Sequence, residues 1–198
     1  MNAIATPKLS CARLLWGVAI FVLAAVLMSI LPFRPAFNKS VSMEVGFYLI
    51  TVKPRGTADA EGTAVSYKYW APDWAVLQYE KHFTEGMRFL KVVGAVPGDY
   101  LYSADEKVYR CKSPSMSKQC DLLAIRQVKD GLGNPLPWIK YDGERIPQGF
   151  YWLKSGEAKA KYAYDSRYLG VVPRTRIEGT VSPILTWGGL PDKESLAL

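Results

Sequence analysis

The sequence predicts a mainly β protein, in which one hydrophobic N-terminal helix precedes a domain of antiparallel strands. Short segments rich in valine, isoleucine, tyrosine, phenylalanine and tryptophan recur between glycine, proline and aspartate residues, a pattern typical of strands separated by turns. One stretch near the N-terminus, residues 14–33, carries no charge. With 198 residues, of which 49% are hydrophobic, the chain is long and apolar enough for one globular unit with a core.

The charge-free stretch, residues 14–33, is closed by Arg13 and Arg34. Its length matches the ~20 residues that a helix needs to cross ~30 Å of hydrocarbon, so we expect one transmembrane anchor. A cleaved secretory signal with Lys8 and Arg13 as its basic region is the alternative, but such signals have shorter apolar regions of ~7–15 residues. Basic residues lie on both sides of the stretch, and the charge rule therefore leaves the orientation open.

The apolar segments beyond the anchor are predicted to form strands in a meander. Asp142-Gly143 indicates a hairpin turn, and Pro147 with Gly149 indicates a second turn. Only residues 74–83 resemble a short helix, and their apolar positions fit a strand period equally well. The predicted strand segments are residues 46–52, 62–70, 87–96, 99–104, 137–146, 149–154 and 170–173.

The charge and composition exclude several classes of partner. The net charge of +7 is modest and no basic stripe occurs, so we expect no nucleic-acid binding. A mild positive excess suits the surface of an anionic bilayer better. The only histidine is His82 and no CxxC pair occurs, so we expect no metal site and no other cofactor.

Cys111 and Cys120 enclose a polar loop, whereas Cys11 lies just before the predicted anchor. A disulfide between the two loop cysteines would place the β domain outside the cytosol. Zinc binding by the two thiolates is the competing interpretation, but further ligands of suitable spacing are missing. The sequence favours the disulfide over zinc binding.

Ser40 and Ser42 follow the anchor closely, and a serine becomes a nucleophile only when a base removes its proton. His82 lies in a segment without the pattern of a serine-hydrolase triad. Lys91 is the other candidate base, because both faces of segment 87–96 carry apolar side chains and burial lowers the pKa of a lysine. The alternative is an edge lysine that reaches solvent, with the two serines forming a polar linker.

Three short boxes occur beyond the anchor and span most of the remaining chain. They are Ser40-x-Ser42-Met43, then Lys91 with Pro97-Gly98-Asp99, then Asp165-Ser166-Arg167 with Gly170. Together they resemble the boxes of the type I signal peptidases, which use a Ser/Lys dyad. Gly46 and Tyr48 match the end of the serine box in TraF-type peptidases of conjugative transfer systems. The resemblance implies a signal-peptidase-like antiparallel β-sheet catalytic domain, residues 36–198, behind the anchor.

The resemblance also implies catalytic roles. Ser42 resembles the nucleophile, and Lys91 resembles the general base that takes its proton. The Ser40 hydroxyl, together with the backbone N–H of Ser42, would stabilise the tetrahedral oxyanion. Met43 would lie in the substrate cleft.

The third box would support the dyad rather than take part in the chemistry. Asp165 and Arg167 resemble a salt bridge that holds a neighbouring strand against the dyad, and Ser166 lies between them. In the family, a serine two residues before the aspartate helps to orient the base, and Ala163 stands there. Another group must then orient Lys91. The candidates are Ser166 and a backbone carbonyl.

Two further positions depart from the family pattern. Lys154-Ser155-Gly156 stands where a Gly-Asp-Asn turn is expected, so the attachment of that loop must differ. Glu44 stands where TraF-type boxes have a proline two residues after the nucleophile, which would alter substrate preference near the cleft.

The expected function is that of a serine endopeptidase in the bacterial inner membrane, with residues 1–13 in the cytoplasm and the β domain in the periplasm. Its partner would be a precursor protein, such as a conjugative pilin or a protein with a signal peptide, and both hydrolysis and cyclisation agree with the sequence. The eight residues from Arg34 to Ser42 reach at most ~26–29 Å, which keeps the nucleophile near the bilayer. The alternative is a catalytically silent, anchored β domain that acts as a scaffold in a secretion or conjugation assembly.

Overall fold

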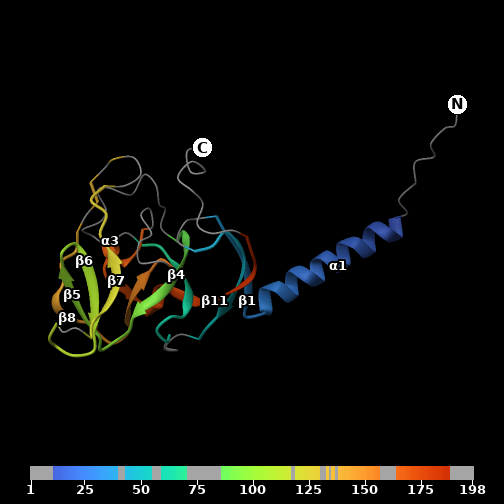
Figure 1. Cartoon of the computed structure of the whole chain (residues 1–198). Helices are drawn as coiled ribbons and strands as arrows, with labels where there is room; N and C mark the ends of the chain where they lie inside the picture. The colour runs from blue at the N-terminus through green and yellow to red at the C-terminus, as the bar shows by residue number, and fades with distance from the viewer. Residues whose placement is uncertain are drawn as a thin grey trace.

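The computed structural model describes residues 11–39, 43–54, 59–70, 86–116, 119–129, 133, 135–136, 138–156 and 164–187. Over these residues the protein consists of two antiparallel sheets with short helical turns, and α1 projects from the larger sheet (Figure 1). The mainly β fold predicted from the strand segments is confirmed. The helix candidate at residues 74–83, which includes His82, lies outside the described residues.

Helix α1 (Cys11–Ile30) is apolar, and its side chains from residue 13 to 27 and at Ile30 are exposed. It ends before Pro32, which lacks a backbone N–H and disfavours a helical conformation of the preceding residue. Within the residues that the structure describes, no helix is both long enough and apolar enough to span a membrane. Phe33, which the predicted anchor includes, belongs to a strand that pairs with the sheet.

Seven strands form the larger sheet, in the order β1-β2-β11-β3-β4-β9-β10. Every neighbouring pair is antiparallel. The prediction of a simple meander is wrong for this sheet, because the C-terminal strand β11 lies between β2 and β3. The strands are β1 (Phe33–Asn38), β2 (Gly46–Val52), β3 (Ala64–Lys68), β4 (Arg88–Ala95), β9 (Phe150–Lys154), β10 (Val172–Pro173) and β11 (Ile177–Thr186).

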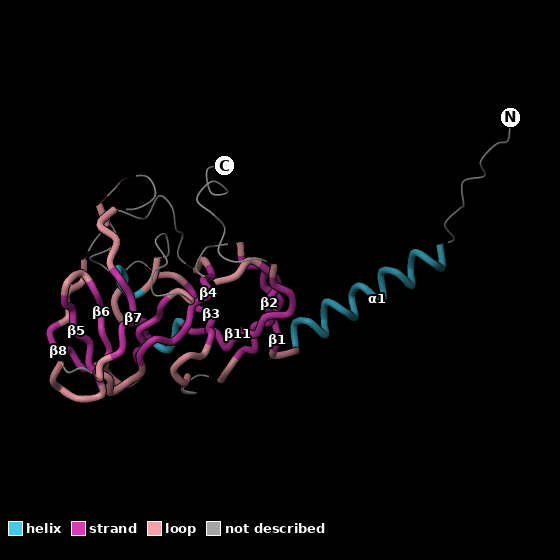
Figure 2. Tube along the Cα trace, viewed as in Figure 1, coloured by secondary structure: helices cyan, strands magenta, loops and turns pink. Residues whose placement is uncertain are grey.

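Four strands form the smaller sheet, in the order β7-β6-β5-β8, at the end of the domain away from α1 (Figure 2). Asp142 and Gly143 lie inside strand β8, so the hairpin predicted there is wrong; the pairing shifts by one residue beside them. Gly143 has φ 84°, and a Cβ would lie 2.9 Å from the Tyr102 hydroxyl. The turn predicted at Pro147 and Gly149 does precede β9. The strands are β5 (Tyr100–Ala104), β6 (Lys107–Cys111), β7 (Asp121–Ile125) and β8 (Asp142–Arg145).

Three buried clusters of apolar side chains stabilise this arrangement. The largest contains Val65 and Val93 and extends to the short helix α3 (Ser166–Leu169). The second joins the two sheets, because Trp152 of β9 packs with Leu101 of β5. The third contains Leu90, whose side chain points to the opposite face of β4 from Val93. Strand β4 is therefore covered on both faces, and it is the strand that carries Lys91.

Candidate active site

Lys91 lies in the middle of β4, opposite Val65 of β3, and its side chain is only 1% exposed. Alternation places it on the same face as Val93, which belongs to the largest apolar cluster. Burial penalises the charged ammonium, and the pKa of Lys91 is lowered from 10.5 to about 8, although the nearby carboxylate of Asp165 opposes this shift. The Lys91 amine is therefore neutral in an appreciable fraction of molecules near neutral pH.

Ser155 is the polar partner of this amine. The β4–β9 pairing sets Val92 opposite Lys154, and one further residue in the same register sets Lys91 opposite Ser155. Lys91 Nζ donates a hydrogen bond to Ser155 Oγ at 3.4 Å. Ser155 itself is 1% exposed, so this contact lies in the interior.

Asp165 fixes Ser155 from the other side. The Oδ2 atom of Asp165 accepts hydrogen bonds from both the hydroxyl and the backbone N–H of Ser155, each at 3.1 Å. Arg167 donates to both carboxylate oxygens of Asp165, with Nε to Oδ1 at 2.8 Å and Nη2 to Oδ2 at 3.0 Å. Both members of this ion pair are 1% exposed. A bidentate, fully buried pair has a single well-defined geometry, and it transmits that geometry to Ser155.

Ser166 does not replace the missing orienting serine at Ala163. The hydroxyl of Ser166 accepts a hydrogen bond from the backbone N–H of Leu153 at 2.8 Å, which fastens α3 to β9. The hypothesis that Ser166 holds Lys91 is wrong, because among the described residues the amine donates to Ser155. Ala163 itself lies outside the described residues.

In the sequence, Ser155 stands out only as a departure from the Gly-Asp-Asn turn. The feature that places Ser155 beside Lys91 is the pairing register of two predicted strand segments, 87–96 and 149–154. Antiparallel pairing of these segments brings the end of the second strand beside the middle of the first. Pairing cannot be read from one sequence without knowing which strands are neighbours.

Ser40 and Ser42 lie outside the described residues, but both ends of their segment are described. Asn38, at the end of β1, donates from Nδ2 to the carbonyl oxygens of Met43 at 2.9 Å and Glu44 at 3.0 Å. Beyond the segment, the Tyr48 hydroxyl donates to the Glu44 carbonyl oxygen at 2.7 Å. The turn between β1 and β2 is thus closed by two side chains.

Met43 packs against the apolar cluster that contains Leu90, the chain neighbour of Lys91. This cluster covers the face of β4 that carries Leu90, opposite to the face from which the Lys91 side chain projects. Gly46 lets β2 approach β11 closely, because a Cβ at this position would lie 2.3 Å from the Leu185 carbonyl oxygen. The glycine of the serine box thus has a packing role next to the turn.

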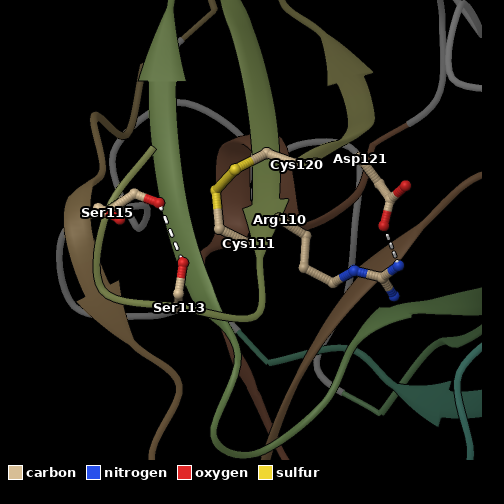
Figure 3. Close-up of a disulfide and its surroundings, with 6 residues drawn as sticks. All are labelled: Arg110, Cys111, Ser113, Ser115, Cys120 and Asp121. Carbon is tan, nitrogen blue, oxygen red and sulfur yellow. Dashed lines mark hydrogen bonds and ion pairs between the residues drawn. A yellow bond between two sulfur atoms is a disulfide. The ribbon is translucent and has the colours of Figure 1, made fainter. Parts of the chain in front are cut away.

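Cys111 and Cys120 form a disulfide that joins the end of β6 to the residue before β7 (Figure 3). Their sulfur atoms are bonded to each other, so they are not available as zinc ligands. Beside them, Arg110 forms ion pairs with Asp121 and Glu61 and donates to the Gly94 carbonyl of β4 at 3.2 Å. Among the described residues, no group of three or more histidine, cysteine, aspartate or glutamate side chains could hold a metal ion.

The arrangement around Lys91 defines a class of site. A buried, partly neutral amine can accept a proton from a hydroxyl and return it to a leaving group, which is the task of a general base in a hydrolase. Such an amine is one chemical requirement of a serine hydrolase whose base is lysine rather than histidine.

Comparison with known families gives the membership. The family model described as signal peptidase, peptidase S26, matches residues 11–187. The chain therefore belongs to the signal peptidase family, peptidase S26, and the family predicted from the three boxes is confirmed. Membership implies a serine peptidase that acts on proteins bearing signal peptides.

Among solved structures, the chain is similar to a signal peptidase I from Enterococcus faecalis V583. The two chains share 15% sequence identity, the match covers 63% of this chain and 97% of that chain, and the TM-score is 0.32. No curated protein matches the sequence at a significant level.

Proposed function

We propose that the protein is a serine endopeptidase in which Ser42 is the nucleophile and Lys91 is the general base. The buried amine of Lys91 is the observation that carries this proposal. A lysine inside a sheet, with a pKa of about 8, destabilises the fold relative to an apolar residue, because its charged form is poorly solvated there. The same burial is what a proton acceptor requires, and the three sequence boxes support this role.

In the proposed reaction, the neutral Lys91 amine takes the proton of the Ser42 hydroxyl as its oxygen attacks the substrate carbonyl. The bond between carbonyl carbon and nitrogen then breaks, and the Lys91 ammonium gives its proton to the leaving amine. The product remains as an acyl ester on Ser42. Water then attacks this ester while Lys91 takes its proton. The bond between the acyl carbon and the Ser42 oxygen breaks, the Lys91 ammonium returns the proton to that oxygen, and the carboxylic acid is released.

The oxyanion of each tetrahedral intermediate would be stabilised by the Ser40 hydroxyl and the backbone N–H of Ser42. Removal of one donor of this kind typically lowers the rate ~10²–10³-fold. The hydrogen bonds of Asn38 and Tyr48 to Glu44 and Met43 support such a site, because they restrict both ends of the segment that carries the donors.

The proposal extends to location. We place α1 in the bacterial inner membrane and the sheets in the periplasm, with Met43 in the substrate cleft. The exposed apolar side chains of α1 support contact with lipid, and the disulfide of Cys111 with Cys120 supports an oxidising compartment. Extraction of membranes at alkaline pH and protease protection of spheroplasts test the two statements separately. Recovery in the soluble fraction would contradict the first, and protection of the β domain from external protease would contradict the second.

The substrate would be a precursor protein such as a conjugative pilin, as in TraF-type peptidases, with small residues beside the cleaved bond. The acyl ester on Ser42 can react with water to give a cut product, or with the amine at the other end of the same chain to give a circle. Mass spectrometry distinguishes the two, because the circular product is lighter than the linear one by one water molecule.

The decisive experiment compares precursor processing by the wild type, Ser42→Ala and Lys91→Met. Both variants should abolish cleavage, because each removes one half of the dyad. Lys68→Met and Ser113→Ala are matched controls, since Lys68 lies half exposed on the neighbouring strand β3 and Ser113 is exposed in the disulfide loop. Normal processing by Ser42→Ala and Lys91→Met would reject the dyad and favour the catalytically silent scaffold.

A further inference from the structure

We infer that Ser155 is the positioning residue of Lys91: its hydroxyl, fixed by Asp165, holds the amine in the orientation that can take a proton from the nucleophile. This inference rests on the proposed Ser/Lys function and deepens it. It assigns a role to the position at which the chain departs from the Gly-Asp-Asn turn.

Ser155 is held in one conformation by its hydrogen bonds. Its backbone N–H and its hydroxyl both bond to the same oxygen of Asp165, at 3.1 Å each. The backbone bond fixes where the residue lies, and the hydroxyl bond fixes the side-chain rotamer. Asp165 is itself restrained by Arg167 and by its place at the N-terminus of α3, where Oδ1 accepts from the Arg167 backbone N–H. The hydroxyl therefore has one orientation.

The hydroxyl of Ser155 is a donor to Asp165 and an acceptor for Lys91. Because Ser155 gives its hydroxyl proton to Asp165, its oxygen lone pairs are left for Lys91, and the amine is the donor in their contact at 3.4 Å. A neutral amine has two N–H bonds and one lone pair. With one N–H directed at Ser155, rotation about the terminal C–N bond is restricted, and the lone pair is directed away from Ser155.

Ser155 also separates the Lys91 amine from the charge of Asp165. A carboxylate in direct contact with Lys91 would stabilise the ammonium and raise its pKa, which would suppress the base. Ser155 instead lies between the two groups as a neutral link, and Arg167 offsets the charge of Asp165. The net result of burial and these two charges is a lowered pKa of the amine. The link thus orients Lys91 without keeping it protonated.

The test uses the purified full-length chain in detergent and a quenched fluorescent peptide with small residues around the cleaved bond. Ser155→Ala should lower kcat by about 10–100-fold, a part of the ~10²–10⁴ that a positioned base contributes, with KM within about twofold of the wild type. The acid limb of the kcat/KM profile should move to lower pH, because the ammonium loses an acceptor that stabilised it. Ser103→Ala is the matched control, since its hydroxyl accepts a hydrogen bond from the Tyr141 backbone far from Lys91.

A second hydroxyl should rescue the variant. Adding Ala163→Ser to Ser155→Ala restores a serine at the position where the family has one, and we expect at least tenfold recovery of kcat. A purely structural role of Ser155 predicts loss of the folded fraction without any shift of the acid limb. If Ser155→Ala does not fold, Ser155→Cys keeps the side-chain size with a weaker acceptor and serves for the same comparison.

The outcomes separate this inference from the proposed function. An unchanged kcat and acid limb in Ser155→Ala, together with an inactive Lys91→Met, would overturn the positioning role and leave the dyad intact. Activity in Lys91→Met would overturn both. A lowered kcat with a shifted acid limb and rescue by Ala163→Ser is the result that we expect.

Discussion

The side-chain amide of Asn38 donates to the carbonyl oxygen of Met43 at 2.9 Å, so the last residue of β1 is bonded to the residue that follows Ser42. A second bond from the same nitrogen reaches Glu44. Asn38 is nearly buried, at 6% exposure, and these bonds therefore have little competition from water. The turn with the predicted nucleophile is thus closed by a side chain that no sequence box contains.

Replacement of Asn38 should impair catalysis more than stability. Asn38→Ala removes both donors and should cost about 1–3 kcal/mol of unfolding free energy, and it should lower kcat because the turn is less restrained. Asn38→Asp should be worse than alanine, since it turns an oxygen toward two carbonyl oxygens. Peptide cleavage and urea unfolding measure the two effects. Equal activity of Asn38→Asp and the wild type would contradict this role.

Activity should depend on pH through Lys91. Its pKa of about 8 lies below the ordinary value, and the neutral amine is the active form in the proposed reaction. We therefore expect kcat/KM to rise about tenfold per pH unit below pH 8 and to level off above it. A peptide assay from pH 5.5 to 10 gives the profile. A profile that falls between pH 6 and 8 would be incompatible with an amine base.

Removal of Lys91 should stabilise the fold while it abolishes activity. The unfolded chain holds the lysine proton up to about pH 10.5, but the folded chain releases it near pH 8, so the unfolded state binds more protons between these values. The destabilisation by Lys91 is therefore complete below pH 8 and is relieved as the pH rises toward 10.5. Lys91→Met should gain on the order of 1–3 kcal/mol at pH 7. Urea unfolding should show a smaller gain in unfolding free energy at pH 10 than at pH 7.

The buried pair of Asp165 and Arg167 should be costly to break. Asp165→Ala leaves the Arg167 charge without its partner and releases Ser155, so we expect a loss of about 3–5 kcal/mol. Glu106→Ala is the control, because its ion pair with Arg126 lies at the surface and should contribute no more than about 1 kcal/mol. Equal losses of unfolding free energy in the two variants would show that the buried pair stabilises the fold no more than the surface pair does.

The disulfide should be detectable both chemically and by stability. Maleimide should label one of the three cysteines, Cys11, in the unreduced protein unfolded in denaturant, and all three after reduction. Reduction should lower the unfolding free energy by about 2–3 kcal/mol, or the melting temperature by about 5–10 °C. Cys120→Ser should reproduce the loss. Three labelled thiols before reduction would contradict the bridge.

Local patterns predicted the strands well where they alternate clearly. Residues 46–52 match β2, and segments 87–96 and 149–154 contain β4 and β9. Strand β1 was missed because Phe33 continues the apolar run of α1. The ten-residue β11 was missed because the alternation of its first half ends at Pro183, after which two apolar residues follow one another. The prediction of a hairpin at Asp142-Gly143 is wrong because Gly143 lies at a shift in strand pairing rather than in a turn.

In the candidate site, too, local sequence patterns predict some features, whereas contacts between residues far apart in the sequence determine others. The burial of Lys91 follows from the apolar residues on both sides of it in the chain, which are visible in the sequence. Its contact with Ser155 depends on the pairing of strands that are far apart in the sequence, and Asn38 bonds to Met43 without any sequence pattern of its own. Such contacts depend on the neighbour order of the strands, which no local pattern specifies.

Strand β1 begins three residues after α1 ends, and its six paired residues extend for about 20 Å before the turn that carries Ser42. With α1 placed in the bilayer as proposed, β1 sets a constant distance between the membrane and the Ser42 nucleophile. Such an enzyme would select the peptide bond that it cleaves partly by the distance of that bond from the membrane. Insertion of two residues into β1 would then relocate the cut along the precursor while leaving the preference for small side chains unaltered.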